Sequence, residues 1–290
     1  MTPTERRHRL RRILHGDECV HPATVWDPIS ARLADGVGYE VGVLPGSLAA
    51  ATVLGAPDII LLTLTEFAEQ ARRVTRYSRL SLIADADHGY GNALNAMRAV
   101  EELEAAGVAG LTLEDTLLPA QFGKSAEEMA PVAEMVGKLK AALRARADPS
   151  LVIVGRTNAL RSSNLSDCVE RLRAYAQAGA DAVMVVGVKT LAEVEAIGRA
   201  ASLPVVLGNV AANAPAPLSD RAVLASHRVR VAFQGPLPFL AAVKAVHDTL
   251  RLLKDGGAPA ALAGSVATDD LFNQAVRRAD YAGWQKEFLS

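Results

Sequence analysis

The sequence predicts an α/β fold in which eight parallel strands, each followed by a helix, close into a (β/α)8 barrel. The chain has 290 residues, which is long for one ordinary domain but normal for such a barrel. Half of its residues are hydrophobic and only 4% are aromatic, so Ala, Val, Leu and Ile build the core, as they do around buried parallel strands. Apolar runs recur about every thirty residues, and a helical pattern follows each of them.

The predicted strands are eight apolar runs. In chain order they are Glu18–Ala23, Tyr39–Leu44, Ser81–Ala84, Gly110–Leu113, Leu151–Gly155, Ala182–Val186, Pro204–Leu207 and Val229–Phe233. The helical stretches between them include Ala93–Ala106, Val132–Ala147, Leu165–Ala178 and Leu191–Ala201. Eight such units in a chain of this length indicate a barrel. An open, doubly wound sheet is the alternative, and it is weakened because no GxGxxG motif follows the first strand.

Both ends of the chain add helices to the expected barrel. Residues 1–17 are basic and helix-like, and we expect them to cap the barrel floor rather than to act as a targeting peptide. Residues 18–255 are expected to form one barrel domain, and residues 256–290 a linker and a terminal helix. Within the C-terminal part we expect a helix over Leu237–Leu253 and a final helix over Thr268–Leu289. The Gly/Ala/Pro linker between them is loose enough for the last helix to pack on a neighbouring subunit.

Charge and cysteine content exclude several classes of function. The formal net charge of −1 favours neither a nucleic acid nor a membrane surface as a partner. Cys19 and Cys168 are the only cysteines, and they lack the CxxC spacing of a zinc site or a disulfide framework. No apolar run reaches the length of a membrane span. We therefore expect a reduced, cytoplasmic protein.

Residues 82–91 form an apolar run that ends in two carboxylates and a glycine-rich turn. Asp85 and Asp87 are two residues apart, so in a strand both side chains point the same way. A buried strand carries two acids at its end only with a compensating cation. The pattern predicts a site for a hard divalent metal, most simply Mg²⁺, with Mn²⁺ as a substitute. The alternative is that the two acids cap the next helix or pair with Lys or Arg.

Polar residues also follow the other predicted strands, at the barrel end where catalytic groups gather. In chain order they are Gly46, Ser47, Asp85, Asp87, Glu114, Arg156 and Gln234, and Asp58 lies in the segment after the second strand. The alternative for Glu114 is a salt bridge to Arg156 across the barrel mouth. For Ser47 the alternative is a helix N-cap, and for Asp58 it is a turn or N-cap.

These polar residues form a rim at one end of the expected barrel, and this rim suits chemistry on a metal-bound 2-oxo acid. Arg156 would hold the substrate carboxylate in a fork, and the backbone N–H groups of Gly46 and Ser47 would stabilise a developing enolate. A metal held by one carboxylate of this rim would act as a Lewis acid on the same oxygen. We take Asp85, Arg156 and Ser47 as the catalytic candidates, and Gly46, Ser47, Arg156 and Gln234 as the substrate-binding candidates. Decarboxylation or C–C cleavage through an enolate is the expected reaction.

The chain resembles the isocitrate lyase/phosphoenolpyruvate mutase superfamily from about residue 18 to the end of the eighth strand. The likeness rests on the motif ADADHGYGN at residues 84–92 and on LED at residues 113–115. Within the superfamily the chain is most similar to the oxaloacetate decarboxylase branch, through EDTLLPAQFG at residues 114–123 and GRTN at residues 155–158.

The resemblance implies a metal site and an assembly. Asp85 would be the direct Mg²⁺ ligand, and Asp58, Asp87 and Glu114 would hold metal-bound waters. The last helix would be swapped between subunits of a homodimer, often within a homotetramer.

The implied activity is Mg²⁺-dependent decarboxylation of oxaloacetate, or of a related 2-oxo diacid, to pyruvate and CO₂. Ser47 and Arg156 would bind this small-molecule substrate. Two alternatives stay open. One is a C–C bond lyase that acts on a substituted malate or citrate analogue, and the other is a non-catalytic homologue that binds 2-oxo acids.

The loops separate this chain from other branches of the superfamily. Isocitrate lyases carry Lys-Lys-Cys-Gly-His after strand four, but here no Cys or His lies between Glu114 and Met135. The Lys-x-Asn-Ser loop of phosphoenolpyruvate mutases is also absent. The chain departs from the decarboxylase branch at Pro45, which replaces a glycine, and at Pro236, which replaces a histidine. The loop Ala211–Pro217 is longer than expected and lacks both a tyrosine and phosphate-cradling glycines.

Overall fold

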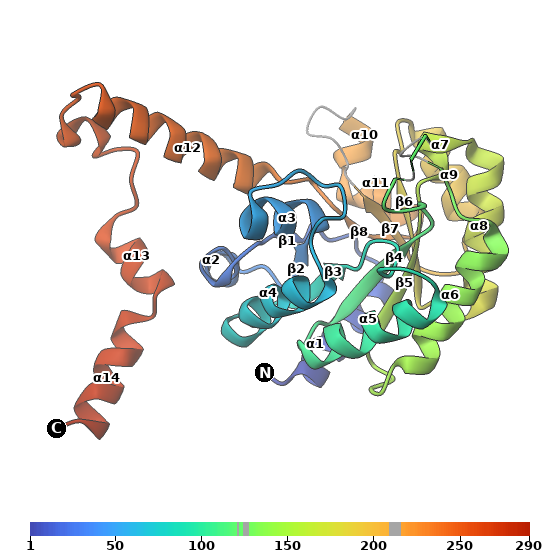
Figure 1. The fold of residues 1–290 in the computed structure, drawn as a ribbon, viewed down its shortest axis with the longest axis horizontal. Coiled ribbons are helices and arrows are strands. Elements are labelled where there is room, and N and C mark those ends of the chain that lie inside the picture. The colour runs from blue at the N-terminus through green and yellow to red at the C-terminus, as the bar shows by residue number, and fades with distance from the viewer. Residues whose placement is uncertain (121, 124–127, 209–215) are drawn as a thin grey trace.

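The eight strands form one parallel sheet, in which each strand pairs with the next along the chain (Figure 1). The structure is a computed structural model that describes residues 1–120, 122–123, 128–208 and 216–290. The strands are β1 Ala23–Thr24, β2 Val41–Leu44, β3 Ser81–Asp85, β4 Gly110–Glu114, β5 Val152–Thr157, β6 Ala182–Val186, β7 Val205–Gly208 and β8 Val229–Ala232. A parallel bridge between Val20 and Val231 joins the chain before β1 to β8 and completes the ring. The predicted barrel is confirmed.

Seven strands lie within two residues of their predicted bounds, and the first strand differs. Only Ala23 and Thr24 pair with β2, although we expected a strand from Glu18 to Ala23. Pro22 has no N–H for a ladder, and Val20 pairs on the other side, with β8. The first strand is therefore divided between its two neighbours.

The helices lie outside the sheet, either packed around it or extending away from it. They are α1 Pro3–His15, α2 Pro28–Val37, α3 Gly46–Leu54, α4 Leu64–Tyr77, α5 Ala93–Ala105, α6 Val132–Ala145, α7 Ala159–Ser162, α8 Leu165–Ala178, α9 Leu191–Ala200, α10 Ala216–Ser219, α11 Arg221–Ser226, α12 Leu237–Lys254, α13 Asp269–Ala275 and α14 Arg278–Phe288, with a 3₁₀ turn at Pro259–Leu262. The single final helix expected over Thr268–Leu289 is two helices. Arg277 lies between them in a left-handed conformation, with φ 55°, which interrupts the helix.

The strand residues alternate between two apolar layers, as a period of two requires. Ile83, Val154 and Met184 belong to the cluster inside the barrel. Their strand neighbours, such as Leu82 and Ile153, pack in the larger layer between the strands and the outer helices. Every second residue of a strand therefore points into the barrel interior, and the residues between point toward the helices.

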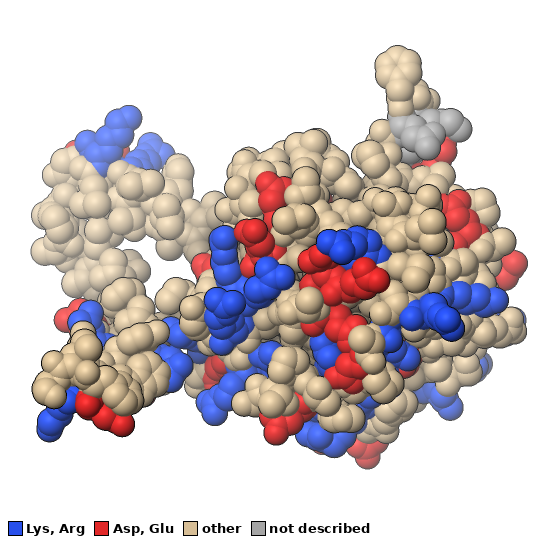
Figure 2. Space-filling model, turned by 60° about the horizontal axis from the view of Figure 1, so that its bottom comes forward, with Lys and Arg blue, Asp and Glu red and all other residues tan. Residues whose placement is uncertain are grey.

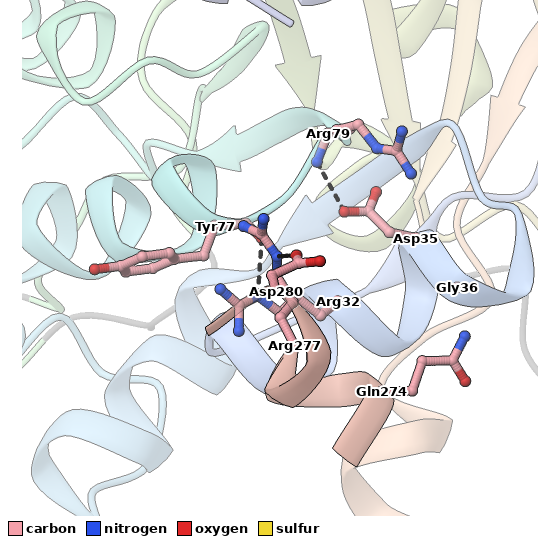
Figure 3. Close-up of a pocket in the computed structure, with 8 residues that line it drawn as sticks. All are labelled: Arg32, Asp35, Gly36, Tyr77, Arg79, Gln274, Arg277 and Asp280. Atoms are coloured by element: carbon pink, nitrogen blue, oxygen red, sulfur yellow. Dashed lines mark hydrogen bonds and ion pairs between the residues drawn. The ribbon is translucent and has the colours of Figure 1, made fainter. Parts of the chain in front are cut away.

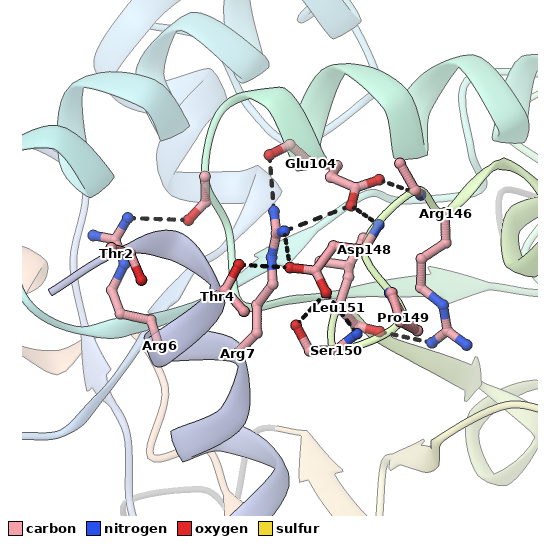
Figure 4. A network of polar contacts seen from close by, with 12 residues as sticks. Thr2, Thr4, Arg6, Arg7, Glu104, Arg146, Asp148, Pro149, Ser150 and Leu151 are labelled. Atoms are coloured by element: carbon pink, nitrogen blue, oxygen red, sulfur yellow. Dashed lines mark hydrogen bonds and ion pairs between the residues drawn. The ribbon is translucent and has the colours of Figure 1, made fainter.

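Helix α1 closes the floor of the barrel with arginines (Figure 4). Arg7 forms an ion pair with Asp148 at 2.7 Å, and its Nε donates to the carbonyl of Val108 at 3.1 Å. Arg11 forms an ion pair with Asp181 at 2.9 Å, just before β6. The buried Leu10 fills the interior from below. The floor is thus held by contacts to the chain at the starts of several strands.

Helix α12 leaves the barrel instead of packing on it (Figure 1). None of its residues is buried, and a row of apolar side chains is exposed along it, namely Leu237, Leu240, Val243, Val246, Leu250 and Leu253. The chain then returns to α2, where the Arg32 guanidinium donates to the carbonyl of Ala275 at 3.3 Å. A hollow of about 450 Å³ lies at this junction, between α2 and the α13–α14 corner (Figure 3).

Positive and negative side chains lie side by side over the face drawn in Figure 2. This mixture agrees with a formal net charge of −1. None of the helices in the described ranges has both the length and the apolar character of a membrane span.

Candidate active site

A cavity of about 200 Å³ opens at the barrel end where the strands finish. Ser47, Asp58, Asp85 and Arg156 line it, so the structure brings four of the predicted site residues together. Its apolar wall is formed by Val43, Pro45, Met184, Val186, Phe233 and Pro236. Drug-sized ligands occupy pockets of roughly 300–1,000 Å³, so this cavity suits a smaller metabolite.

Strand β3 aims its terminal acid into the barrel. Asp85 continues the inward direction of Ile83, and it accepts hydrogen bonds from Thr112 at 3.1 Å and from Arg156 at 2.9 Å. Asp87 follows in a left-handed conformation with φ 46°, the first of several positive φ angles that continue to Gly91. Asp87 lies against Gly46, because a Cβ added to Gly46 would be 2.9 Å from the Asp87 Oδ1 atom. The two acids and the start of α3 therefore meet at one place.

Arg156 bridges the acids of two neighbouring strands. Its Nη1 atom contacts both carboxylate oxygens of Asp85, at 2.9 and 3.1 Å, and its Nη2 atom lies 2.6 Å from Glu114. Glu114 and Arg156 are also register partners of β4 and β5. The salt bridge that we considered as the alternative for Glu114 is thus present. The Nε atom of Arg156 is buried and has no partner in the described part of the chain.

The carboxylates of the site outnumber the positively charged groups near them. Burial raises the pKa of Asp58 and of Asp87, the neighbouring Asp85 raises both further, and burial also raises the pKa of Glu114. His88 supplies no charge near neutral pH, because burial lowers its pKa to about 4. Four carboxylates therefore face a single guanidinium.

This donor set fits a hydrated divalent cation. A divalent ion would supply two of the three positive charges that the acids lack. Within the described ranges, no three Asp, Glu, His or Cys side chains are grouped as direct ligands of one ion. Mg²⁺ keeps several waters and takes only one or two carboxylates directly, so it suits this arrangement.

The N-terminus of α3 faces the same cavity. Pro45 is the N-cap residue, Gly46 and Ser47 begin the helix, and no side chain caps it. The alternative that Ser47 is the N-cap is therefore wrong. The first N–H groups of a helix have no partner within the helix and attract negative charge. Gly46 and Ser47 thus offer backbone donors beside the acids.

Gln234 does not line this cavity, so the structure does not bring it together with the other predicted site residues. Val231 belongs to the cluster inside the barrel, and Phe233 packs against that cluster and lines the cavity. The next residue of an extended chain points the other way. Gln234 lines two other hollows, next to α2 and the start of α12.

Sequence reasoning missed Arg161, which also lines the cavity. Asp115, the neighbour of Glu114, points away from the site into the helix layer. It is fully buried and accepts hydrogen bonds from Tyr175 at 2.7 Å, from Arg171 at 3.1 Å and from the Asn158 backbone at 3.1 Å. Our remarks on the loop Ala211–Pro217 concern residues that lie mostly outside the described part of the chain.

Comparisons with known proteins identify the family of this chain. The sequence model of the family described as phosphoenolpyruvate phosphomutase matches residues 10–254. A relative from Bradyrhizobium diazoefficiens named oxaloacetate decarboxylase is 50% identical over 275 residues, which cover 95% of this chain and 94% of that protein. A relative of the same name from Rhodopseudomonas palustris is 52% identical over 276 residues, with coverage of 95% and 94%.

Solved structures share the whole fold. A phosphonopyruvate hydrolase in complex with oxalate and Mg²⁺ superposes with a TM-score of 0.86 at 27% identity, and 100% of both chains is covered. An oxaloacetate acetylhydrolase bound to the inhibitor 3,3-difluorooxaloacetate gives a TM-score of 0.86 at 28% identity, with coverage of 99% of this chain and 98% of that one.

Proposed function

The chain belongs to the phosphoenolpyruvate phosphomutase family, within the isocitrate lyase/phosphoenolpyruvate mutase superfamily, and from this premise we propose that it is a Mg²⁺-dependent oxaloacetate decarboxylase. It would convert oxaloacetate, or a related 2-oxo diacid, to pyruvate and CO₂. The observation that carries the proposal is the small cavity lined by Asp58, Asp85 and Arg156 beside the open N-terminus of α3. Glu114 contacts Arg156, and Asp87 lies against Gly46, just behind this lining. Relatives named oxaloacetate decarboxylase are about half identical over nearly the whole chain.

In this proposal Asp85 holds the metal ion directly. Asp58, Asp87 and Glu114 hold waters of its coordination shell, which suits the absence of three grouped direct ligands in the described residues. The site offers only hard oxygen donors, which suit Mg²⁺ and also Mn²⁺, and we propose Mg²⁺ as the resident ion. When bound, the ion acts as a Lewis acid on the keto oxygen of the substrate.

The protein's own groups bind the substrate and stabilise the enolate. The guanidinium of Arg156 has five donors, and its buried Nε is without a partner in the described residues, so the group can bind a carboxylate while it still faces the acids. The N–H groups of Gly46 and Ser47 stabilise the charge that develops on the enolate oxygen. CO₂ leaves without needing a proton, so the carbon–carbon bond breaks without a general acid.

A direct assay tests the function. Purified protein with Mg²⁺ should release pyruvate from oxaloacetate faster than the same concentration of free Mg²⁺ does. EDTA should remove the protein-dependent rate, and added Mg²⁺ should restore it. A rate equal to the free-metal background would contradict the proposal, and malate and citrate analogues would then be tested for cleavage.

We also propose that the protein is at least a homodimer in which α12, and not the last helix that the sequence led us to expect, packs on the partner's barrel. The helix exposes an apolar row and buries none of its own residues. A mostly apolar hollow of about 590 Å³ lies beside α2 and the start of α12, where an eighth barrel helix would pack, and Trp26, Ile29 and Leu33 help to line it. A second copy of α12 has the length and the apolar face to cover this region.

Substitutions on α12 test the dimer. The double variant Val246→Asp with Leu250→Asp places two charges in the apolar row, and light scattering should show a lower molar mass than that of the parent protein. Lys244→Gln lies on the same helix and is the matched control, which should keep the parent mass. A parent protein that is already monomeric, or a double variant that keeps its mass, would contradict the swap.

A further inference from the structure

Arg161 lies at the mouth of the cavity without a charge partner. It belongs to the short helix α7 after β5, and it lines the cavity together with Asp85 and Arg156. Its guanidinium makes no hydrogen bond or ion pair in the described part of the chain. Arginine usually finds a carboxylate or carbonyl when one is near, so an unpaired guanidinium at a cavity is available to a ligand.

The end of β6 fixes the position of this side chain. Gly187 follows β6 with φ +91°, and a Cβ at that residue would lie only 2.7 Å from the Arg161 Cγ atom. The stem of Arg161 thus rests on the backbone of Gly187, in space that a glycine leaves open. This contact holds the base of the side chain against the barrel, next to the cavity.

The charge of the site leaves a role for this second arginine. Arg156 already faces Asp85 and Glu114, at 2.9 and 2.6 Å. A divalent ion together with Arg156 still leaves the four carboxylates with one uncompensated negative charge. A dianionic substrate would add two more. Among the residues that line the cavity, Arg161 is the other permanent cation, so it is the group that can receive the second carboxylate.

We propose that Arg161 determines specificity by binding the distal carboxylate of the substrate, the one that leaves as CO₂. The proposal rests on the proposed function, because it assumes a 2-oxo diacid whose other end meets the metal ion and Arg156. The contact between Arg161 and the distal carboxylate makes the enzyme selective for diacids over 2-oxo monoacids. In the reaction the bond between C3 and the distal carboxylate breaks, its electron pair forms the enolate, and neutral CO₂ dissociates from Arg161. A proton from solvent then adds to C3 and gives pyruvate.

This role has a kinetic signature. The ion pair with Arg161 exists in the bound substrate and weakens in the transition state, as negative charge moves from the carboxylate to the enolate. Interactions of that kind lower KM without raising kcat. The variant Arg161→Gln should therefore raise the KM for oxaloacetate about 10- to 100-fold, with kcat unchanged or higher.

Equilibrium binding provides a test that does not depend on turnover. Calorimetry with the Mg²⁺-loaded protein would use 3,3-difluorooxaloacetate, which has a distal carboxylate, and oxalate, which occupies only the metal end. Arg161→Gln should bind difluorooxaloacetate about 10- to 100-fold more weakly and oxalate within twofold of the parent protein. Arg161→Lys should recover part of the lost affinity. Arg173→Gln, at an exposed arginine of α8, is the matched control and should bind both ligands like the parent.

The outcomes separate this proposal from the proposed function. Equal binding of difluorooxaloacetate by the parent and Arg161→Gln overturns the role of Arg161, whether or not oxaloacetate is a substrate. An equal loss of affinity for both ligands in Arg161→Gln also overturns the role, because the residue then supports the site as a whole. Selective loss of difluorooxaloacetate, in a protein that releases no pyruvate, keeps the role of Arg161 and refutes the decarboxylase. A parent protein that binds no difluorooxaloacetate overturns both.

Discussion

Replacing Asp85 with alanine should lower the kcat/KM for metal-dependent oxaloacetate decarboxylation by more than about 100-fold, which is the upper range for losing a residue that only orients a metal ligand. Asp85 lines the cavity and accepts hydrogen bonds from Arg156 and Thr112, so its carboxylate is held toward the site. Asp87 and Glu114 do not line the cavity, and we expect them to act through water. Pyruvate release at saturating Mg²⁺ measures the effect.

A thermal-shift series distinguishes lost metal binding from a damaged fold. Mg²⁺ should raise the Tm of the parent protein, because a ligand that binds only the folded state stabilises it. Asp85→Ala should remain folded and lose this Mg²⁺-dependent increase. Asp35→Ala, at an acid of α2 that accepts a hydrogen bond from the Arg79 backbone N–H, is the control and should keep both the increase and the activity. EDTA-sensitive turnover near the parent rate in Asp85→Ala would refute the metal site.

Replacing Asp115 with alanine should destabilise the protein by about 3–5 kcal/mol, the usual cost of removing one partner of a buried ion pair. Asp115 is fully buried and joins Arg171 of α8, Tyr175 of α8 and the backbone after β5. Its loss leaves the Arg171 guanidinium with fewer partners inside the helix layer. Urea unfolding followed by circular dichroism measures the change in the free energy of unfolding.

The matched control for Asp115 is the other carboxylate that contacts Arg171. Asp167 lies 3.0 Å from the Arg171 Nε atom, one helical turn away, and it is partly exposed. Asp167→Ala should therefore cost at most about 1 kcal/mol. The fraction of Asp115→Ala that stays folded should keep Mg²⁺-dependent turnover, because Asp115 does not reach the cavity. A change below about 1 kcal/mol in Asp115→Ala would contradict its structural role.

The alternation of strand residues explains why much of the site could be predicted. Asp85 and Glu114 end their strands, and Arg156 is the last residue but one of β5. Asp85 is in phase with Ile83 and Arg156 with Val154, which both belong to the barrel interior. The same rule, applied to β8, would have placed Phe233 in the cavity and Gln234 outside it. That signal was present in the sequence, since Val231 and Phe233 share one face.

Other features of the structure have no recognisable pattern in the sequence. Arg161 lies in a helix of only four residues, too short for a periodic pattern to show which way a side chain points. The apolar row of α12 has the same sequence pattern whether the helix packs on its own barrel or on that of another subunit. The break at Arg277 depends on a left-handed conformation that arginine rarely adopts, so the sequence favours one continuous helix there.

The arginine floor has a consequence for the order in which the protein folds during its synthesis. Helix α1 precedes every strand of the barrel in the chain, but Arg11 bonds to Asp181, which follows 170 residues later. At translation rates of about 5–20 residues per second, roughly 10–30 s pass between the synthesis of the two partners. Helix α1 therefore cannot complete its contacts with the barrel floor until the chain reaches β6.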